Sequence, residues 1–128
     1  MIYLDTSVVL AQLLAEDRRP APALWENTLA TSRLLEYEVW TALHRQRLAA
    51  SHGDAARAIL ARLAFVELRP ESLARALEPF PKPVRTLDAL HLASADFLRQ
   101  LGQDVELASY DERLIVAARA LKFKIATL

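Results

Sequence analysis

Short apolar runs alternate with longer segments of helical periodicity along the whole chain. The short runs predict buried strands, and these lie at residues 2–5, 65–68, 105–108 and 124–127. The periodic segments predict helices, which lie at residues 6–15, 22–29, 34–48, 54–63, 71–77, 87–101 and 112–121. Strands that alternate with helices indicate an α/β protein, in which a mostly parallel sheet is covered by helices on both faces.

Several of these segments carry start or stop signals. Thr6 or Ser7 stands near the N-cap of the first predicted helix, and Gly53 precedes the fourth. Gly102 follows the helix at residues 87–101, at the position after a helix where glycine is favoured. The chain has only two glycines, so it cannot form a glycine-rich phosphate-binding loop.

Composition indicates one folded domain that spans residues 1–128. The chain is 53% hydrophobic and 25% charged, as in an ordinary globular protein. It has no cysteine, which excludes disulfides and thiolate metal sites and suits the cytoplasm, where we expect the protein to reside. The N-terminus has no basic leader, and the uncharged stretch at residues 6–15 is too short to cross a bilayer. We therefore expect neither a signal peptide nor contact with a membrane.

The net charge is zero, with 16 basic and 16 acidic side chains, whereas nucleic-acid binders more often carry a basic excess. Nearly all the basic residues are arginine, whose guanidinium group suits bidentate contacts with phosphate. The same bias also fits the base composition of the coding sequence. Net charge therefore decides little about the ligand.

Two aspartates follow predicted strands. Asp5 directly ends the first strand between two apolar segments, and Asp111 lies three residues after Ala108. Either residue could serve as a turn residue or helix cap. A buried charge at Asp5 would need a cation or several hydrogen-bond donors. Because ligands bind beyond the carboxyl ends of parallel strands, we expect both carboxylates at the same edge of the sheet.

Further acids lie on the predicted helices. Asp88 occupies a first turn, where the helix dipole favours negative charge, but its apolar neighbours predict an interior position. Glu36 and Glu38 lie on opposite borders of one apolar face, so periodicity cannot choose between them. Asp96 and Asp104 lie away from the expected edge and are predicted to have no functional role.

Clustered carboxylates repel one another and raise each other's pKa unless a cation lies between them. Their oxygen ligands suit Mg²⁺ or Mn²⁺, which also bind substrate phosphates and keep several waters. The chemistry that this predicts is attack of metal-activated water on a phosphodiester.

Four segments, in order, resemble the motifs of PIN-domain nucleases. They are YLDTSVVL at residues 3–10, SRLLEYEVWTAL at 32–43, RTLDALHLASA at 85–95 and ASYDERL at 108–114. The acid of the second motif corresponds to Glu38. The single-domain length further resembles the VapC-type toxins of bacterial toxin–antitoxin pairs.

The resemblance implies a three-layer α/β/α sandwich and a Mg²⁺-dependent endoribonuclease, with Mn²⁺ as a possible substitute. It implies an RNA substrate, an inhibitory antitoxin and a homodimer. It also implies that Ser7 supports the first aspartate. The usual glycine near the last strand is replaced here by Lys122 or Phe123. The catalytic and metal-binding residues that the resemblance implies are Asp5, Glu38, Asp88 and Asp111.

Two alternatives remain open from the sequence. An aspartyl-phosphate phosphatase or phosphoacceptor domain also has an Asp after its first strand, but commonly has a second Asp at the position that Ser7 occupies. A non-catalytic partner-binding domain of the same fold would not require four intact acidic motifs. Arg85 and Arg113 are expected to orient neighbouring acids through ion pairs, with phosphate or antitoxin contacts as the other possibility. His91 is expected to be a packing residue.

Overall fold

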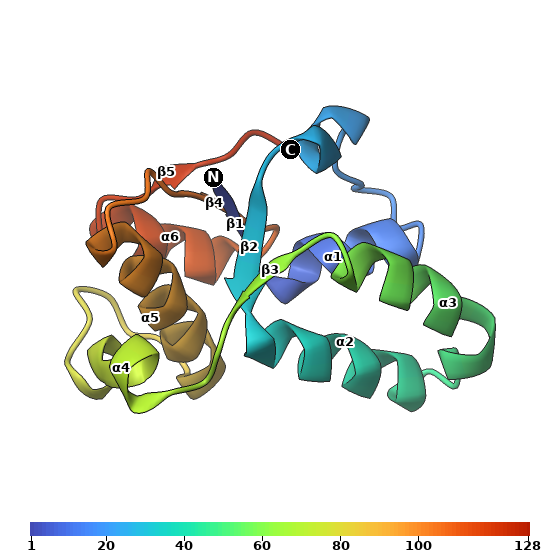
Figure 1. The fold of residues 1–128 in the computed structure, drawn as a ribbon, viewed down its shortest axis with the longest axis horizontal. Coiled ribbons are helices and arrows are strands. Elements are labelled where there is room, and N and C mark those ends of the chain that lie inside the picture. Colours follow the sequence, from blue (N-terminus) through green and yellow to red (C-terminus); the bar gives the residue numbers. More distant parts are fainter.

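A five-stranded parallel sheet divides the protein into two helical layers (Figure 1). The computed structural model describes all of residues 1–128. The strand order is β3-β2-β1-β4-β5, and every neighbouring pair is parallel. The strands are β1 (Ile2–Leu4), β2 (Leu29–Ser32), β3 (Ala64–Val66), β4 (Glu106–Ala108) and β5 (Lys124–Ile125).

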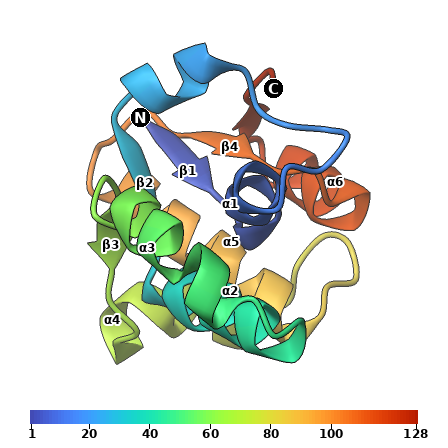
Figure 2. The same ribbon diagram turned by 90° about the vertical axis from the view of Figure 1, so that its right-hand side faces the viewer.

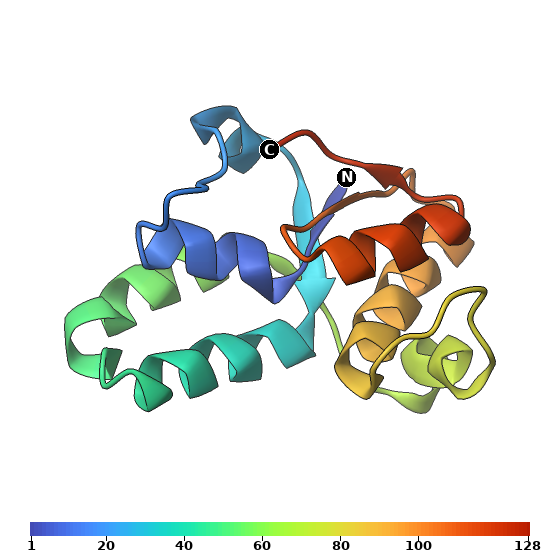
Figure 3. The same ribbon diagram turned by 180° about the vertical axis from the view of Figure 1, so that it is seen from behind.

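Helices cover both faces of this sheet, as Figures 1 and 3 show from opposite sides. One layer consists of α1 (Thr6–Leu13), α2 (Arg33–Arg45) and α3 (Ala49–Leu60), which lie in front of the strands in Figure 2. The other layer contains α5 (Thr86–Gln100) and α6 (Glu112–Ala120). The short helix α4 (Pro70–Leu73) and the 3₁₀ turns η1 (Pro22–Glu26) and η2 (Ala74–Leu77) complete the chain. The predicted three-layer α/β/α sandwich is confirmed.

Strand β1 lies at the centre of the sheet and contributes to both cores. Because successive side chains of a strand point to opposite faces, Ile2 and Leu4 join the core beneath α1, α2 and α3, whereas Tyr3 joins the core beneath α5 and α6. Tyr3 and Leu4 are completely buried. None of the helices combines the length and apolar composition needed to cross a bilayer.

The helix predicted at residues 22–29 is wrong. Only the 3₁₀ turn η1 forms there, and residue 29 begins strand β2, which the sequence pattern did not predict. The pattern failed because half of β2 is polar although the whole strand is buried. Thr31 is accommodated by donating a hydrogen bond of 2.8 Å from Oγ1 to the carbonyl oxygen of Leu4. Ser32 is accommodated as the N-cap of α2, where its Oγ accepts from the backbone N–H of Leu34 at 3.1 Å.

One predicted helix start is confirmed and one needs correction. Asp5 is the N-cap of α1, as one of the two interpretations of this residue expected, and Thr6 is the first residue of the helix. Gly53 lies inside α3, which begins four residues earlier than that glycine. A Cβ at Gly53 would lie 3.3 Å from Cη2 of Trp40, so glycine here serves the close packing of α2 against α3.

Four helices are followed by a residue with positive φ, and only one of these residues is glycine. Gly102 follows α5 with a φ of +93°, as predicted. Ala15, Arg47 and Lys122 adopt φ values of 51°, 56° and 68° after α1, α2 and α6. Lys122 is exposed. It lies in the turn before the last strand, where the nucleases that the sequence resembles usually have a glycine. This turn therefore carries backbone strain that a glycine would relieve.

We predict that Lys122→Gly stabilises the protein. Relief of a left-handed backbone contributes about 1–2 kcal/mol, and the added freedom of the unfolded chain costs about 0.5–1 kcal/mol. The net gain in the free energy of unfolding should be about 0.5–1 kcal/mol, measured by urea denaturation. Lys124→Gly, at an exposed position within β5, is the matched control and should destabilise the protein. Equal losses in both variants would contradict the prediction.

Candidate active site

The site lies where β1 and β4 end side by side. Leu4 is in register with Ala108, and the backbone N–H of Asp5 donates to the carbonyl oxygen of Ala108 at 3.1 Å. Asp5 and Ser109 are therefore neighbours beyond the carboxyl edge of the sheet. This confirms the expectation that the residues following these two strands meet at one edge.

Asp5 is only 5% exposed, and both of its carboxylate oxygens accept hydrogen bonds. Oδ1 accepts from the backbone N–H and the hydroxyl of Ser7, at 2.8 and 2.5 Å. Oδ2 accepts from the hydroxyl of Ser109 at 2.5 Å. Asp5 is thus a helix cap and a buried charge at the same time, and the two explanations offered for it do not compete.

No basic side chain forms an ion pair with Asp5. Burial raises the pKa of its carboxyl above the ordinary value, although hydrogen bonds from Ser109 and Ser7 act in the opposite direction. The charge is therefore supported by dipoles without being neutralised. A cation at this edge would offset the cost of burying it.

The two serines also join α1 to the segment after β4. The Ser7 hydroxyl accepts from the backbone N–H of Tyr110 at 2.9 Å, and the Ser109 hydroxyl accepts from that of Asp111 at 2.8 Å. Ser7 supports Asp5, as the resemblance implies. Ser109 was missed in the sequence analysis, although its place directly after β4 matches the place of Asp5 after β1 and could have identified it.

Asp111 is half-buried and is the N-cap of α6. Its Oδ1 accepts from the backbone N–H groups of Arg113 and Leu114 at 3.0 and 3.5 Å. The backbone N–H of Asp111 donates to the hydroxyl of Ser109, which itself donates to Asp5, and this holds Asp111 close to Asp5.

The structure places the two glutamates of α2 in different surroundings. Oε1 of Glu38 accepts from Oγ1 of Thr6 and lies 2.7 Å from Nε2 of His91. Burial acts to raise the pKa of the Glu38 carboxyl, but hydrogen bonds from His91 and Thr6 outweigh it and hold the pKa below its ordinary value. Glu36 instead forms an ion pair of 2.7 Å with Arg33. Glu38 is thus the glutamate that lies against the first turn of α1.

His91 is 4% exposed and has a partner at each ring nitrogen. Nδ1 lies 2.7 Å from the hydroxyl of Tyr3, and Nε2 contacts Glu38. The prediction of a packing residue is incomplete, because it found no such partners. The sequence contained a signal for this contact. Tyr3 carries a hydroxyl on a central strand, and His91 lies on the helix face expected to cover that strand.

Asp88 lies one turn before His91 on α5. It is half-buried, with Oδ2 3.4 Å from the backbone N–H of Arg85. The interior position predicted for it is wrong, because the first turn of α5 reaches the surface and leaves Leu87 48% exposed.

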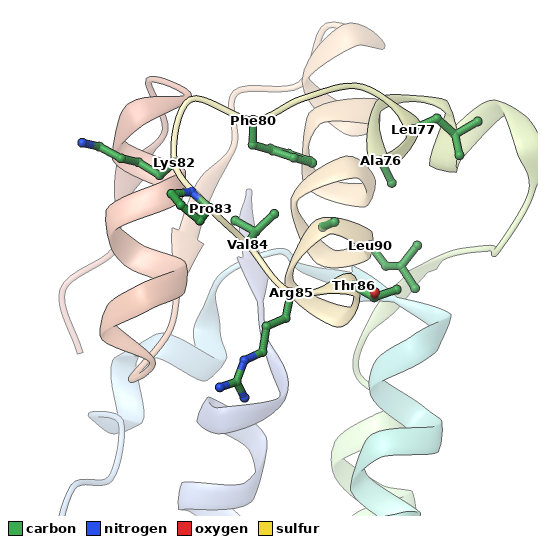
Figure 4. A pocket seen from close by; sticks show the side chains of 10 residues that line it. Ala76, Leu77, Phe80, Lys82, Pro83, Val84, Arg85, Thr86 and Leu90 are labelled. Carbon is green, nitrogen blue, oxygen red and sulfur yellow. The ribbon is translucent and has the colours of Figure 1, made fainter.

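The ion pairs predicted for Arg85 and Arg113 are also wrong. Both side chains are exposed and form none. In Figure 4 the Arg85 side chain points away from Phe80 and Leu90. Two exposed guanidinium groups thus flank the helix starts that carry Asp88 and Asp111.

Two hollows lie near the start of α5. One, of about 390 Å³, is lined by Glu38 and Thr6 together with the exposed Tyr37 and Leu87. The other, of about 450 Å³, lies under the loop that contains Phe80 and is lined by no acidic side chain (Figure 4). Only the first therefore opens onto a residue of the acidic edge.

The acids do not form a ready-made metal cage. No three His, Asp or Glu side chains are grouped closely enough to hold a metal ion. Each acidic side chain instead faces its own hydrogen-bond donors. Like charges repel one another when no cation lies between them, and this repulsion favours the separation. Mg²⁺ does not require such a cage, because it is often bound through one or two carboxylates, waters and substrate phosphates. The carboxylate donors and the unneutralised charge of Asp5 therefore fit a hard divalent cation.

Comparison with known proteins agrees with these features. The model of the PIN domain family matches residues 2–120. Ribonuclease VapC35 of Mycobacterium tuberculosis is 34% identical over 132 residues, covering 98% of this chain and 95% of that protein. Ribonuclease VapC46 of the same organism is 36% identical over 126 residues, covering 94% and 92%.

Two solved structures share the fold. A toxin–antitoxin complex from Klebsiella pneumoniae aligns with a TM-score of 0.70 at 17% identity, over 99% of this chain and 97% of the other. The sarcin–ricin loop cleaving toxin VapC20 of Mycobacterium tuberculosis aligns with a TM-score of 0.66 at 24% identity, over 91% and 95%. From the family match and the full-length relatives, the chain belongs to the PIN domain family and, within it, to the VapC-type ribonucleases.

Proposed function

We propose that this protein is a divalent-metal-dependent endoribonuclease and the toxin of a toxin–antitoxin pair. Its family membership and its full-length relatives named ribonucleases support the reaction class. The observation that carries the proposal is the buried Asp5 carboxylate, which has three hydrogen-bond donors and no basic partner. Hydrogen bonds from neutral donors offset part of the cost of burying this charge, but buried charges are normally also paired or coordinate metals.

The carboxylates that would hold Mg²⁺ or Mn²⁺ are those of Asp5, Glu38, Asp88 and Asp111. Such an ion supplies activation of water and stabilisation of charge on the phosphodiester. The protein's own residues prepare the site. Ser7 and Ser109 fix both oxygens of Asp5, and the cap of α6 fixes Asp111. The exposed Arg85 and Arg113 are free to contact RNA phosphates.

The proposed partner is an antitoxin that covers the hollow beside Glu38. Tyr37 and Leu87 at this hollow are 62% and 48% exposed, an apolar character that suits a protein partner. Arg45 also lines the hollow and offers a contact for an acidic side chain of the partner. We further propose a cytoplasmic homodimer as the state in which the toxin acts.

The first prediction compares the two glutamates of α2. Glu38→Gln should reduce cleavage of RNA in Mg²⁺ by about a hundredfold or more, because loss of a metal-binding carboxylate should cost at least as much as loss of an outer hydrogen-bond partner, which costs about 10–100-fold. Glu36→Gln should retain most activity, because Glu36 pairs with Arg33 away from the site. The measurement is gel analysis of a labelled RNA in Mg²⁺, with EDTA as the metal-free reference. Loss of activity in Glu36→Gln with retention in Glu38→Gln would reverse the assignment.

The second prediction separates metal binding from structural support at Asp88. Asparagine can still accept the hydrogen bond at the start of α5, so Asp88→Asn should melt like wild type in EDTA. Mg²⁺ at a hundredfold excess over its dissociation constant should stabilise wild type by about 2.7 kcal/mol. Asp88→Asn should lose most of this increment. A lower melting temperature in EDTA with the Mg²⁺ increment intact would identify Asp88 as structural.

The third prediction concerns toxicity. Expression of the chain alone in bacteria should arrest growth, because no antitoxin is present to inhibit RNA cleavage. Asp88→Asn should relieve the arrest, and Asp96→Asn, at an acid that pairs with Arg99, should not. Normal growth with abundant soluble wild-type protein would argue against the toxin assignment.

A further inference from the structure

A chain of hydrogen bonds leads from the centre of the sheet to Glu38. The backbone N–H of Ser32 donates to the hydroxyl of Tyr3 at 3.1 Å, which lies 2.7 Å from Nδ1 of His91. Nε2 of His91 lies 2.7 Å from Oε1 of Glu38. Tyr3 is completely buried and His91 is 4% exposed. This series of hydrogen bonds therefore runs through the protein interior, and Glu38 at its end lines the hollow beside α1.

The partners determine the direction of each bond. The Tyr3 oxygen already accepts from Ser32, so its hydrogen is available for Nδ1 of His91. A neutral imidazole that accepts at Nδ1 carries its own hydrogen at Nε2. His91 then donates to Glu38.

This arrangement makes the two oxygens of Glu38 unequal. Oε1 receives both Thr6 Oγ1 and His91 Nε2 at 2.7 Å, whereas Oε2 makes no hydrogen bond within the protein. No buried side-chain oxygen or nitrogen lacks a partner, so Oε2 is open to solvent. A free glutamate populates several rotamers, and two donors on one oxygen hold the Glu38 side chain in a single one.

We propose that His91 is a positioning residue which, held from behind by Tyr3, fixes Glu38 so that Oε2 is presented to the divalent cation. This inference rests on the proposed metal-dependent function. It assigns Tyr3 and His91 a role that packing alone does not require, because an apolar side chain of similar size could fill the same space. Orientation of a metal-binding carboxylate by an outer hydrogen bond is worth about 10–100-fold in metal affinity.

The test compares Mn²⁺ binding to the folded variants by calorimetry. His91→Phe removes both ring nitrogens and should weaken Mn²⁺ binding about tenfold. His91→Gln restores a donor near the position of Nε2 and should recover most of the affinity. Leu92→Val, which removes a methylene from a completely buried side chain of the same helix, controls for destabilisation and should bind like wild type. Unchanged Mn²⁺ affinity in folded His91→Phe would overturn the proposal.

A second measurement is made on the wild-type protein and needs a variant only to assign the signals of His91. The chain has three histidines, so long-range ¹H–¹⁵N spectra can identify the tautomer of His91. We expect hydrogen at Nε2 in metal-free wild type, and Tyr3→Phe should disturb this preference. Hydrogen at Nδ1 alone in wild type would overturn the proposal even if His91→Phe does not fold.

The two proposals fail in different ways. If wild type neither binds Mn²⁺ nor cleaves RNA, both the proposed function and this inference are wrong. If wild type does both and His91→Phe matches it, only the role of His91 is wrong.

Discussion

The structure depends on how one buried carboxylate is accommodated. Removal of a charge from water costs several kcal/mol unless donors replace the lost hydration. For Asp5 those donors come from Ser7 on α1 and Ser109 after β4. Each serine hydroxyl accepts a backbone N–H from the segment after β4 in turn. Satisfying the charge therefore also joins the first strand–helix unit to the fourth strand, and it brings Asp111 to the same edge.

The same arrangement distinguishes Asp5 from the structural acids of this protein. Glu36 and Asp96 lie against arginines at 2.7 and 2.6 Å, so their charges are neutralised within the protein. Asp5 receives only neutral donors, which stabilise a carboxylate without cancelling its charge. Glu38 lies between these cases, because its histidine partner is a cation only when protonated. None of the four acids that the proposed function assigns to a divalent metal forms an ion pair with an arginine or lysine.

The sequence alone predicted the layers of the fold and the meeting of Asp5 with the residues after β4, because parallel strands end at a common edge. The apolar periodicity did not choose between the two glutamates of α2, since both lie at the border of the apolar face, and only the resemblance assigned Glu38. That choice depends on Thr6 and His91, which are distant in the sequence and adjacent only in the fold. The exposure of the first turn of α5 was likewise not predicted, because it depends on how the helix packs and not on its composition.

Strand β2 shows why one element escaped prediction. A buried strand is expected to be apolar, and Thr31 and Ser32 break that pattern. Yet the backbone N–H of Ser32 donates to Tyr3, and the Ser32 hydroxyl caps the helix that carries Glu38. An apolar residue at position 32 would have made the strand easier to recognise and would have removed the cap of α2. Local rules are expected to fail where a segment serves a site as well as a core, and β2 is such a segment.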